Sequence, residues 1–214
     1  MIKKTFKFAI YIFQLFIFEN GFSQDNKAVL RGDVDVSSKY KFAFLYQVDT
    51  KTRIVTPISE HKFIFELPQS SNLVGKQCYI FLGTDSSRTF ADARHARPYG
   101  EVDYKSVMIE KNVVVHVNGE INKAQVIGGR LNKDLIEMFR FIEEGNYLGF
   151  FSDHTDSTVS LILLNALFAL KDVKYFPLAI DYKEQFSRLS EKVRNSDEGR
   201  KTWEKINKES IFPR

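Results

Sequence analysis

Cysteine is almost absent from this chain, which has one, Cys78, among 214 residues. A single thiol cannot close an intramolecular disulfide. It also cannot supply the Cys-x-x-C pair with which thiol-disulfide enzymes exchange electrons. No cysteine lies near the N-terminus, where a lipoprotein would be acylated. We therefore expect stability to come from the core and no catalysis by paired thiols.

The sequence around Cys78 leaves two interpretations of that thiol. It belongs to the apolar run Cys78–Leu82, which predicts a packed and unreactive side chain. The alternative is a redox role, through a mixed disulfide with a partner protein. That role requires an exposed thiol and a nearby positive charge, for which Lys76 is the candidate.

The chain also lacks a large excess of one charge sign, and it lacks histidines at the spacing of a metal site. There are 31 basic and 27 acidic residues, for a formal net charge of +4, without the concentrated basic patch typical of nucleic-acid binding. The four histidines, His61, His95, His116 and His154, do not have the spacing of a metal site. We therefore predict no nucleic-acid partner, no metal and no cofactor.

The longest apolar run, near the N-terminus, is too short for a membrane anchor. Phe8–Phe18 follows three lysines and precedes small residues, a pattern typical of a secretory signal peptide. We predict a signal peptide over residues 1–23, with cleavage after Ser23, and an extracytoplasmic (periplasmic or secreted) mature chain that has no transmembrane segment. Loss of Lys3, Lys4, Lys7 and Glu19 would lower the net charge from +4 to +2. The alternative is an uncleaved anchor or a buried first helix.

What the sequence does contain, 43% hydrophobic residues and 20 phenylalanines, is ample for a core. Residues 24–129 predict a β-sandwich-like part of short antiparallel strands. Apolar residues alternate along 40–47 and 61–67, and Val113, Val115 and Val117 precede the turn signal Asn118-Gly119. His116 is expected on the solvent side of its strand.

After Gly128-Gly129, interpreted as a turn rather than an anion-binding loop, the apolar spacing becomes helical. Residues 130–214 predict a bundle of about four helices packed on the strands, which makes the fold class α+β. The second helix should start at Asp156 or Ser157 as N-cap and lie at the centre of the bundle. The apolar face of the first predicted helix consists of Leu131, Leu135, Met138, Phe139 and Ile142.

Four stretches carry a likeness to a known bacterial arrangement. They are Val29–Val34, with its glycine; His61–Phe65, which resembles a Gly-Lys-Phe-like strand; Ala124–Asn132, which ends in Leu-Asn; and Phe151–Ser160, which resembles a His-Pro-Asp-Ser helix start with Thr155 in place of proline. Together the chain resembles the N-terminal domain of unknown function that precedes the thioredoxin-like domain of cell-envelope thiol-disulfide oxidoreductases. The sequence ends at Arg214, where that catalytic domain would begin. No catalytic residue is therefore carried over.

This resemblance implies a non-catalytic binding or interaction module of the bacterial envelope. Its expected partner is a thioredoxin-domain protein on another chain, or an extended peptide that pairs with an exposed strand edge.

The alternative function is a small-ligand-binding protein or a hydrolase-like enzyme that uses the polar segment Asp92–Glu101. Within it, Arg94 and Arg97 could clamp a carboxylate or phosphate, with His95 as a proton-transfer group and Asp92 beside them. This reading requires a concave pocket at that segment. A solvated loop is the competing interpretation.

Overall fold

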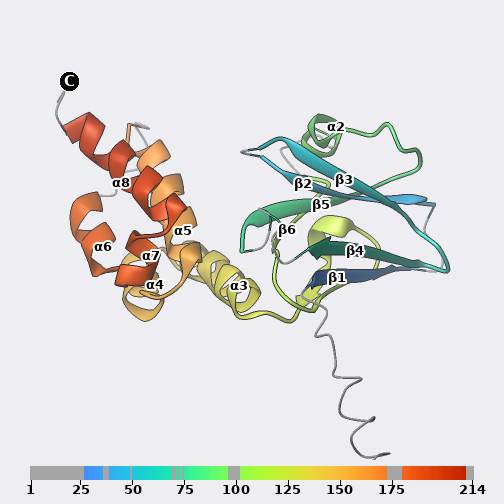
Figure 1. The fold of residues 1–214 in the computed structure, drawn as a ribbon, viewed down its shortest axis with the longest axis horizontal. Helices are drawn as coiled ribbons and strands as arrows, with labels where there is room; N and C mark the ends of the chain where they lie inside the picture. The colour runs from blue at the N-terminus through green and yellow to red at the C-terminus, as the bar shows by residue number, and fades with distance from the viewer. Residues whose placement is uncertain are drawn as a thin grey trace, which may run out of the picture.

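The computed structural model describes residues 27–35, 39–48, 50–68, 71, 73, 75–95, 102–172 and 180–210, so the predicted signal peptide lies outside the described residues. Within them the predicted α+β class is confirmed. Strands fill the first part of the chain and helices the second (Figure 1).

The strands form two open four-stranded sheets in the described part of the chain, with the orders β4-β1-β7-β8 and β3-β2-β5-β6. Neighbouring strands are antiparallel, except for β1 and β7, which run parallel and pair Leu30 with Val113. The strands are β1 Lys27–Val34, β2 Phe42–Gln47, β3 Thr52–Pro57, β4 Lys62–Pro68, β5 Gln77–Gly83, β6 Lys105–Met108, β7 Val113–Val117 and β8 Gln125–Ile127.

The inner faces of both sheets share one core, which makes the strand part a sandwich. Leu30 and Phe65 of the first sheet belong to the same buried cluster as Leu45 and Ile80 of the second. The alternation predicted for β4 is confirmed, since its odd-numbered residues from Phe63 to Leu67 are buried and its even-numbered residues are exposed.

The outer face of the second sheet carries a separate aromatic cluster. Phe44 and Phe81 stack with ring centroids 4.7 Å apart, and Phe90 and Ala93 of the short helix α2 (Phe90–Arg94) cover them. Strand β2 is therefore buried on both faces, where its alternation predicted burial on one. Figure 1 shows α2 beside this sheet.

The helical part surrounds α5, as predicted, with Val159, Leu161, Leu164 and Leu167 buried along it. Ser157 is its N-cap and accepts a hydrogen bond from the backbone N–H of Val159. The other helices of this part within the described residues are α3 Arg130–Glu143, α4 Tyr147–Asp153, α6 Tyr182–Arg188, α7 Glu191–Arg194 and α8 Asp197–Ser210.

Two features of the helical part differ from the prediction of about four helices. A short helix, α4, stands between the first and second predicted helices, with Asn146 as its N-cap. The third predicted helix is divided into α6 and α7 at Leu189, whose extended backbone ends one helix before Ser190 caps the next. Local hydrogen bonding by asparagine and serine therefore divides segments that apolar spacing alone would continue.

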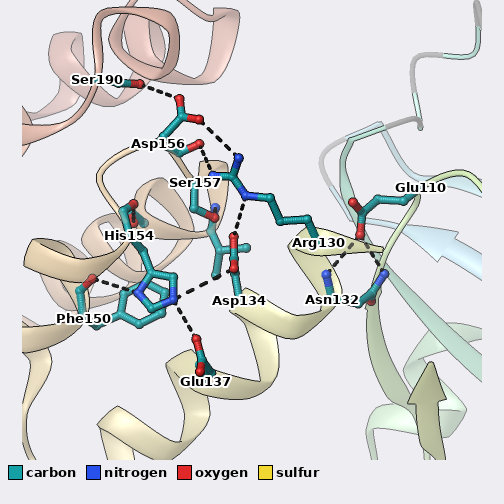
Figure 2. Close-up of polar contacts among 12 residues, drawn as sticks. Glu110, Arg130, Asn132, Asp134, Glu137, Phe150, His154, Asp156, Ser157 and Ser190 are labelled. Carbon is teal, nitrogen blue, oxygen red and sulfur yellow. Dashed lines mark hydrogen bonds and ion pairs between the residues drawn. The ribbon is translucent and has the colours of Figure 1, made fainter. Parts of the chain in front are cut away.

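The start of α3 joins the helices to the sandwich. The buried amide of Asn132 accepts a hydrogen bond from the backbone N–H of Met108 in β6, at 2.9 Å, and donates one to the Met108 carbonyl, at 2.8 Å. The Glu110 carboxylate accepts from the backbone N–H of Asn132, at 3.0 Å, and from its side chain, at 3.1 Å (Figure 2). We call these contacts the Asn132 junction.

The Asn132 junction also explains the glycine pair before α3. Gly129 is the N-cap residue with φ of 78°, and a Cβ there would lie 2.0 Å from the Glu110 Oε2 atom. A carboxylate of the chain itself therefore occupies the helix N-terminus, where a bound anion would otherwise sit. This arrangement agrees with the interpretation of Gly128-Gly129 as a turn.

Candidate functional site

A pocket of about 290 Å3 lies where α3 meets the edge of the sandwich. Its walls come from the edge strand β6, the 3-10 turn Ile121–Lys123, strand β8 and one side of α3. We call it the α3 pocket. It is lined by Val102, Tyr104, Lys105, Ser106, Asn122, Val126, Asn132, Leu135, Ile136 and Phe139.

Polar chemistry in the α3 pocket centres on Lys105, the only charged residue among those that line it. Its ammonium donates a hydrogen bond to the backbone carbonyl of Asn122 at 3.2 Å. Burial removes water from the amine and lowers the pKa of Lys105. The buried Oδ1 atom of Asn122 accepts no hydrogen bond from the described residues. The pocket therefore offers a poorly hydrated cation to a ligand.

The apolar lining of the α3 pocket includes one side chain, Phe139, that the sequence placed in the core. Phe139 was predicted on the buried face of its helix, and this was wrong, because its side chain is 47% exposed. Ile136, one turn before it, is 53% exposed, whereas Leu135 is buried. Packing against the end of the sandwich turns α3 so that Ile136 and Phe139 remain open to solvent. Two large apolar side chains therefore stand at the pocket without a protein surface to cover them.

A second cavity of about 310 Å3 lies between β5 and the helices α5 and α8. Lys76 and Glu198, which both line it, form an ion pair that links the sandwich to α8. Because these two charges already partner each other, we interpret this cavity as part of the contact between the two parts. The α3 pocket is the stronger candidate for a ligand.

The predicted site at Asp92–Glu101 takes a different form in the structure. Asp92 and Arg94 belong to helix α2 and His95 is its C-cap, so the predicted loop is wrong here, while Arg97 lies outside the described residues. Asp92 forms a reciprocal capping box with Thr89, and hydrogen bonds from Thr89 lower the pKa of Asp92. Asp92, Arg94 and His95 are exposed and line neither cavity. Asp92 therefore has a capping role, and α2 covers the aromatic cluster.

Cys78 points into the core shared by the two sheets and has no exposed surface. Burial raises the pKa of its thiol to about 12. Both facts favour the packed, unreactive interpretation, because a thiol that forms mixed disulfides needs access and a stabilised thiolate.

The histidines fall into different surroundings. His116 is half-exposed on β7, and its Nδ1 atom lies 2.6 Å from the Asp33 carboxylate, on the side of the strand that was predicted. His61 is exposed in the turn before β4. His154 lies with Asp134 and Glu137 in one cluster, which histidine spacing alone did not reveal.

Comparisons with protein-family models, with curated proteins and with solved structures found no significant match for this chain. Within the described residues, no helix combines the length and apolarity needed to cross a membrane. The fold thus defines an α+β protein in which an open sandwich is joined to a helical part, with the α3 pocket at the joint.

Proposed function

We propose that this chain is a non-catalytic binding protein that holds a small apolar carboxylate in the α3 pocket. The observation that carries this proposal is Lys105, a half-buried ammonium that is the only charge in an otherwise mostly apolar lining. The pocket volume is close to the lower end of the range for small-molecule sites, roughly 300–1,000 Å3.

Charge complementarity favours an anionic ligand. Burial has weakened the hydration of the Lys105 ammonium, so the negative charge of a carboxylate would stabilise it in place of the missing water. Hydrogen bonds between ions are roughly twice as strong as those between neutral groups. The apolar part of the ligand would lie against Ile136 and Phe139.

The surroundings of Ser106 do not favour a serine nucleophile in the α3 pocket. Ser106 follows Lys105 in the sequence and carries a hydroxyl group. The Oγ atom of Ser106 accepts a hydrogen bond from the Gln77 side-chain amide at 2.7 Å. A serine nucleophile needs instead a general base that accepts its proton. No histidine, aspartate or glutamate is among the lining residues of the α3 pocket.

Calorimetry with 4-phenylbutyrate and its neutral counterpart 4-phenylbutanol tests this proposal. We expect the carboxylate to bind at least tenfold more tightly, which corresponds to about 1.4 kcal/mol. Lys105→Met should remove that preference, because it deletes the cation and retains the length of the side chain. Lys133→Met is the matched control, since Lys133 is an exposed lysine of α3 that does not line the pocket.

Equal affinity for the acid and the alcohol would contradict the proposal, and so would an equal loss in the Lys105→Met and Lys133→Met variants. Circular dichroism of both variants separates a binding defect from a folding defect.

On the basis of the sequence resemblance we also propose that the chain acts in the bacterial envelope, as a companion of a thiol-disulfide oxidoreductase on another chain. Its apolar N-terminal run supports export. Cross-linking in native cells, followed by mass spectrometry, tests this role. Recovery of a thioredoxin-domain protein would support the companion role. Recovery of other proteins alone, or of none, would count against it and leave the ligand proposal intact.

A further inference from the structure

A second cluster of chemically active side chains lies on the far side of α3 from the Asn132 junction (Figure 2). Asp134 and Glu137 are three residues apart on α3, so they project from the same side of the helix. His154, the C-cap residue of α4, points toward both of them. Its Nε2 atom lies 2.8 Å from Glu137 Oε2 and 3.9 Å from Asp134 Oδ1.

The His154 ring is fixed in one orientation. It stacks on Phe150 with centroids 4.2 Å apart and meets the edge of Phe141. Its Nδ1 atom lies 3.2 Å from the Phe150 carbonyl, which can only accept a hydrogen bond. Nδ1 therefore carries a hydrogen, and Nε2 is the nitrogen that faces the two carboxylates.

This orientation directs the Nε2 atom of His154 at the Glu137 carboxylate, at 2.8 Å, with the Asp134 carboxylate beside it at 3.9 Å. One metal ion can be bound by Nε2 and by both carboxylates from this arrangement. An Nδ1–H that donates to a backbone carbonyl is the outer hydrogen bond that metal-ligating histidines usually make.

The distances suit a small divalent ion. The ligand atoms of Asp134, Glu137 and His154 lie within 4.8 Å of one another. Zinc with bonds of about 2.0–2.1 Å keeps tetrahedral ligands roughly 3.3 Å apart. The separations of 2.8 and 3.9 Å lie on either side of that value, so small side-chain rotations suffice.

Neighbouring groups hold the buried carboxylate in place. Asp134 is 8% exposed, and its Oδ2 atom makes an ion pair with Arg130 Nε at 3.8 Å but no hydrogen bond within the described residues. The Arg130 guanidinium also donates to the Asp156 carboxylate at 3.2 Å and to its carbonyl at 3.0 Å. Asp156 accepts a hydrogen bond from Ser190 Oγ, and this bond, with the Arg130 charge, lowers the pKa of Asp156. Arg130 thus approaches Oδ2 and leaves Oδ1 facing His154.

We propose that Asp134, Glu137 and His154 form a divalent transition-metal site, with zinc as the best fit. An imidazole nitrogen favours zinc over magnesium or calcium. Carboxylate oxygens complete a mixed nitrogen and oxygen ligand set of a kind that zinc accepts. Glu137 is half-exposed, so solvent can reach the remaining coordination position. The ion connects α3 to the end of α4 and stabilises the helical part of the fold.

Zinc titration of the metal-stripped full chain, followed by calorimetry and thermal unfolding, tests the site. We expect one zinc per chain and a rise in the unfolding temperature that grows with zinc concentration. Glu137→Gln should weaken zinc binding at least about tenfold, because an amide oxygen cannot replace an anionic ligand. Glu143→Gln makes the same change at an exposed glutamate of the same helix and should leave the zinc affinity unchanged.

Because Glu137 is half-exposed, its substitution should preserve the fold, and circular dichroism checks this. His154→Gln gives a second, independent loss, while His61→Gln removes an exposed histidine as its control. Cobalt should give a ligand-field spectrum in the wild-type chain and not in the Glu137 or His154 variants.

The site would be refuted by the absence of saturable zinc binding, or by equal binding in Glu137→Gln and Glu143→Gln. Lys105→Met should leave zinc binding intact, which keeps this test separate from that of the α3 pocket.

Discussion

Asn132→Leu is expected to lower the free energy of unfolding by about 3 kcal/mol, since a buried polar group that loses its partner costs roughly 1–3 kcal/mol. Leucine has the same branched arrangement of side-chain heavy atoms as asparagine but cannot pair with the backbone N–H and carbonyl of Met108, which the Asn132 side chain satisfies. Both Met108 and Asn132 are buried, so water cannot replace the missing hydrogen bonds.

The same substitution removes one of the two hydrogen bonds to Glu110, the carboxylate that occupies the start of α3. Urea unfolding followed by circular dichroism measures the loss. Lys133→Leu is the matched control: it introduces the same side chain at the next, exposed position of α3, where a change within about 0.5 kcal/mol is expected. A loss below about 1 kcal/mol for Asn132→Leu would show that the Asn132 junction contributes little to stability.

The elements that the sequence predicted well are those whose local pattern and burial agree. Strand β4 alternates because one of its faces meets the core and the other meets solvent. Helix α5 is apolar over most of its length, in agreement with its position between the helices α3, α6 and α8. In both cases the pattern of apolar residues matches the faces that are buried in the fold, so the type of element and its position could be inferred.

The prediction failed where the environment of a residue is set by segments distant in sequence. Phe44 is buried on the outer face of its sheet because α2 covers it, and a five-residue helix has too little periodicity to be recognised. Phe139 shares the helical spacing of Leu135 and Met138, yet the contact of α3 with β6 leaves it exposed. Apolar spacing defines a face of a helix, and only the tertiary packing decides how wide the covered part of that face is.

The two candidate sites could not have been assembled from local motifs. Lys105, Asn122 and Phe139 come from an edge strand, a 3-10 turn and a helix, and none of these segments has a motif of its own. For the proposed metal site, the local signal was the acidic pair Asp134 and Glu137 at helical i, i+3 spacing. His154 joins that pair from the end of another helix, 17 residues beyond Glu137, so a search for histidine spacing could not find it.

Gly32→Ala is expected to lower the free energy of unfolding by about 3 kcal/mol, at the upper end of the usual cost of overpacking a core. Gly32 lies on β1 and pairs with Phe63 of the adjacent strand β4. A Cβ at this position would lie 2.0 Å from Phe63 Cζ and 2.4 Å from Cε1. The ring is 1% exposed and packs edge-on against Phe65, so it can move only by disturbing the core of the sandwich.

A double-mutant cycle with Phe63→Leu identifies steric conflict as the cause. Leucine lacks the ring atoms that a Cβ would meet, so Gly32→Ala should cost at least about 1 kcal/mol less in the Phe63→Leu background, within the coupling seen for residues in contact. Gly119→Asn serves as a control, since Gly119 has open space around its Cβ position and a φ of 83° that asparagine tolerates. Equal costs of Gly32→Ala in the two backgrounds would contradict the steric explanation. A cost that falls in the Phe63→Leu background would show that this glycine is required by the close approach of an aromatic ring to β1.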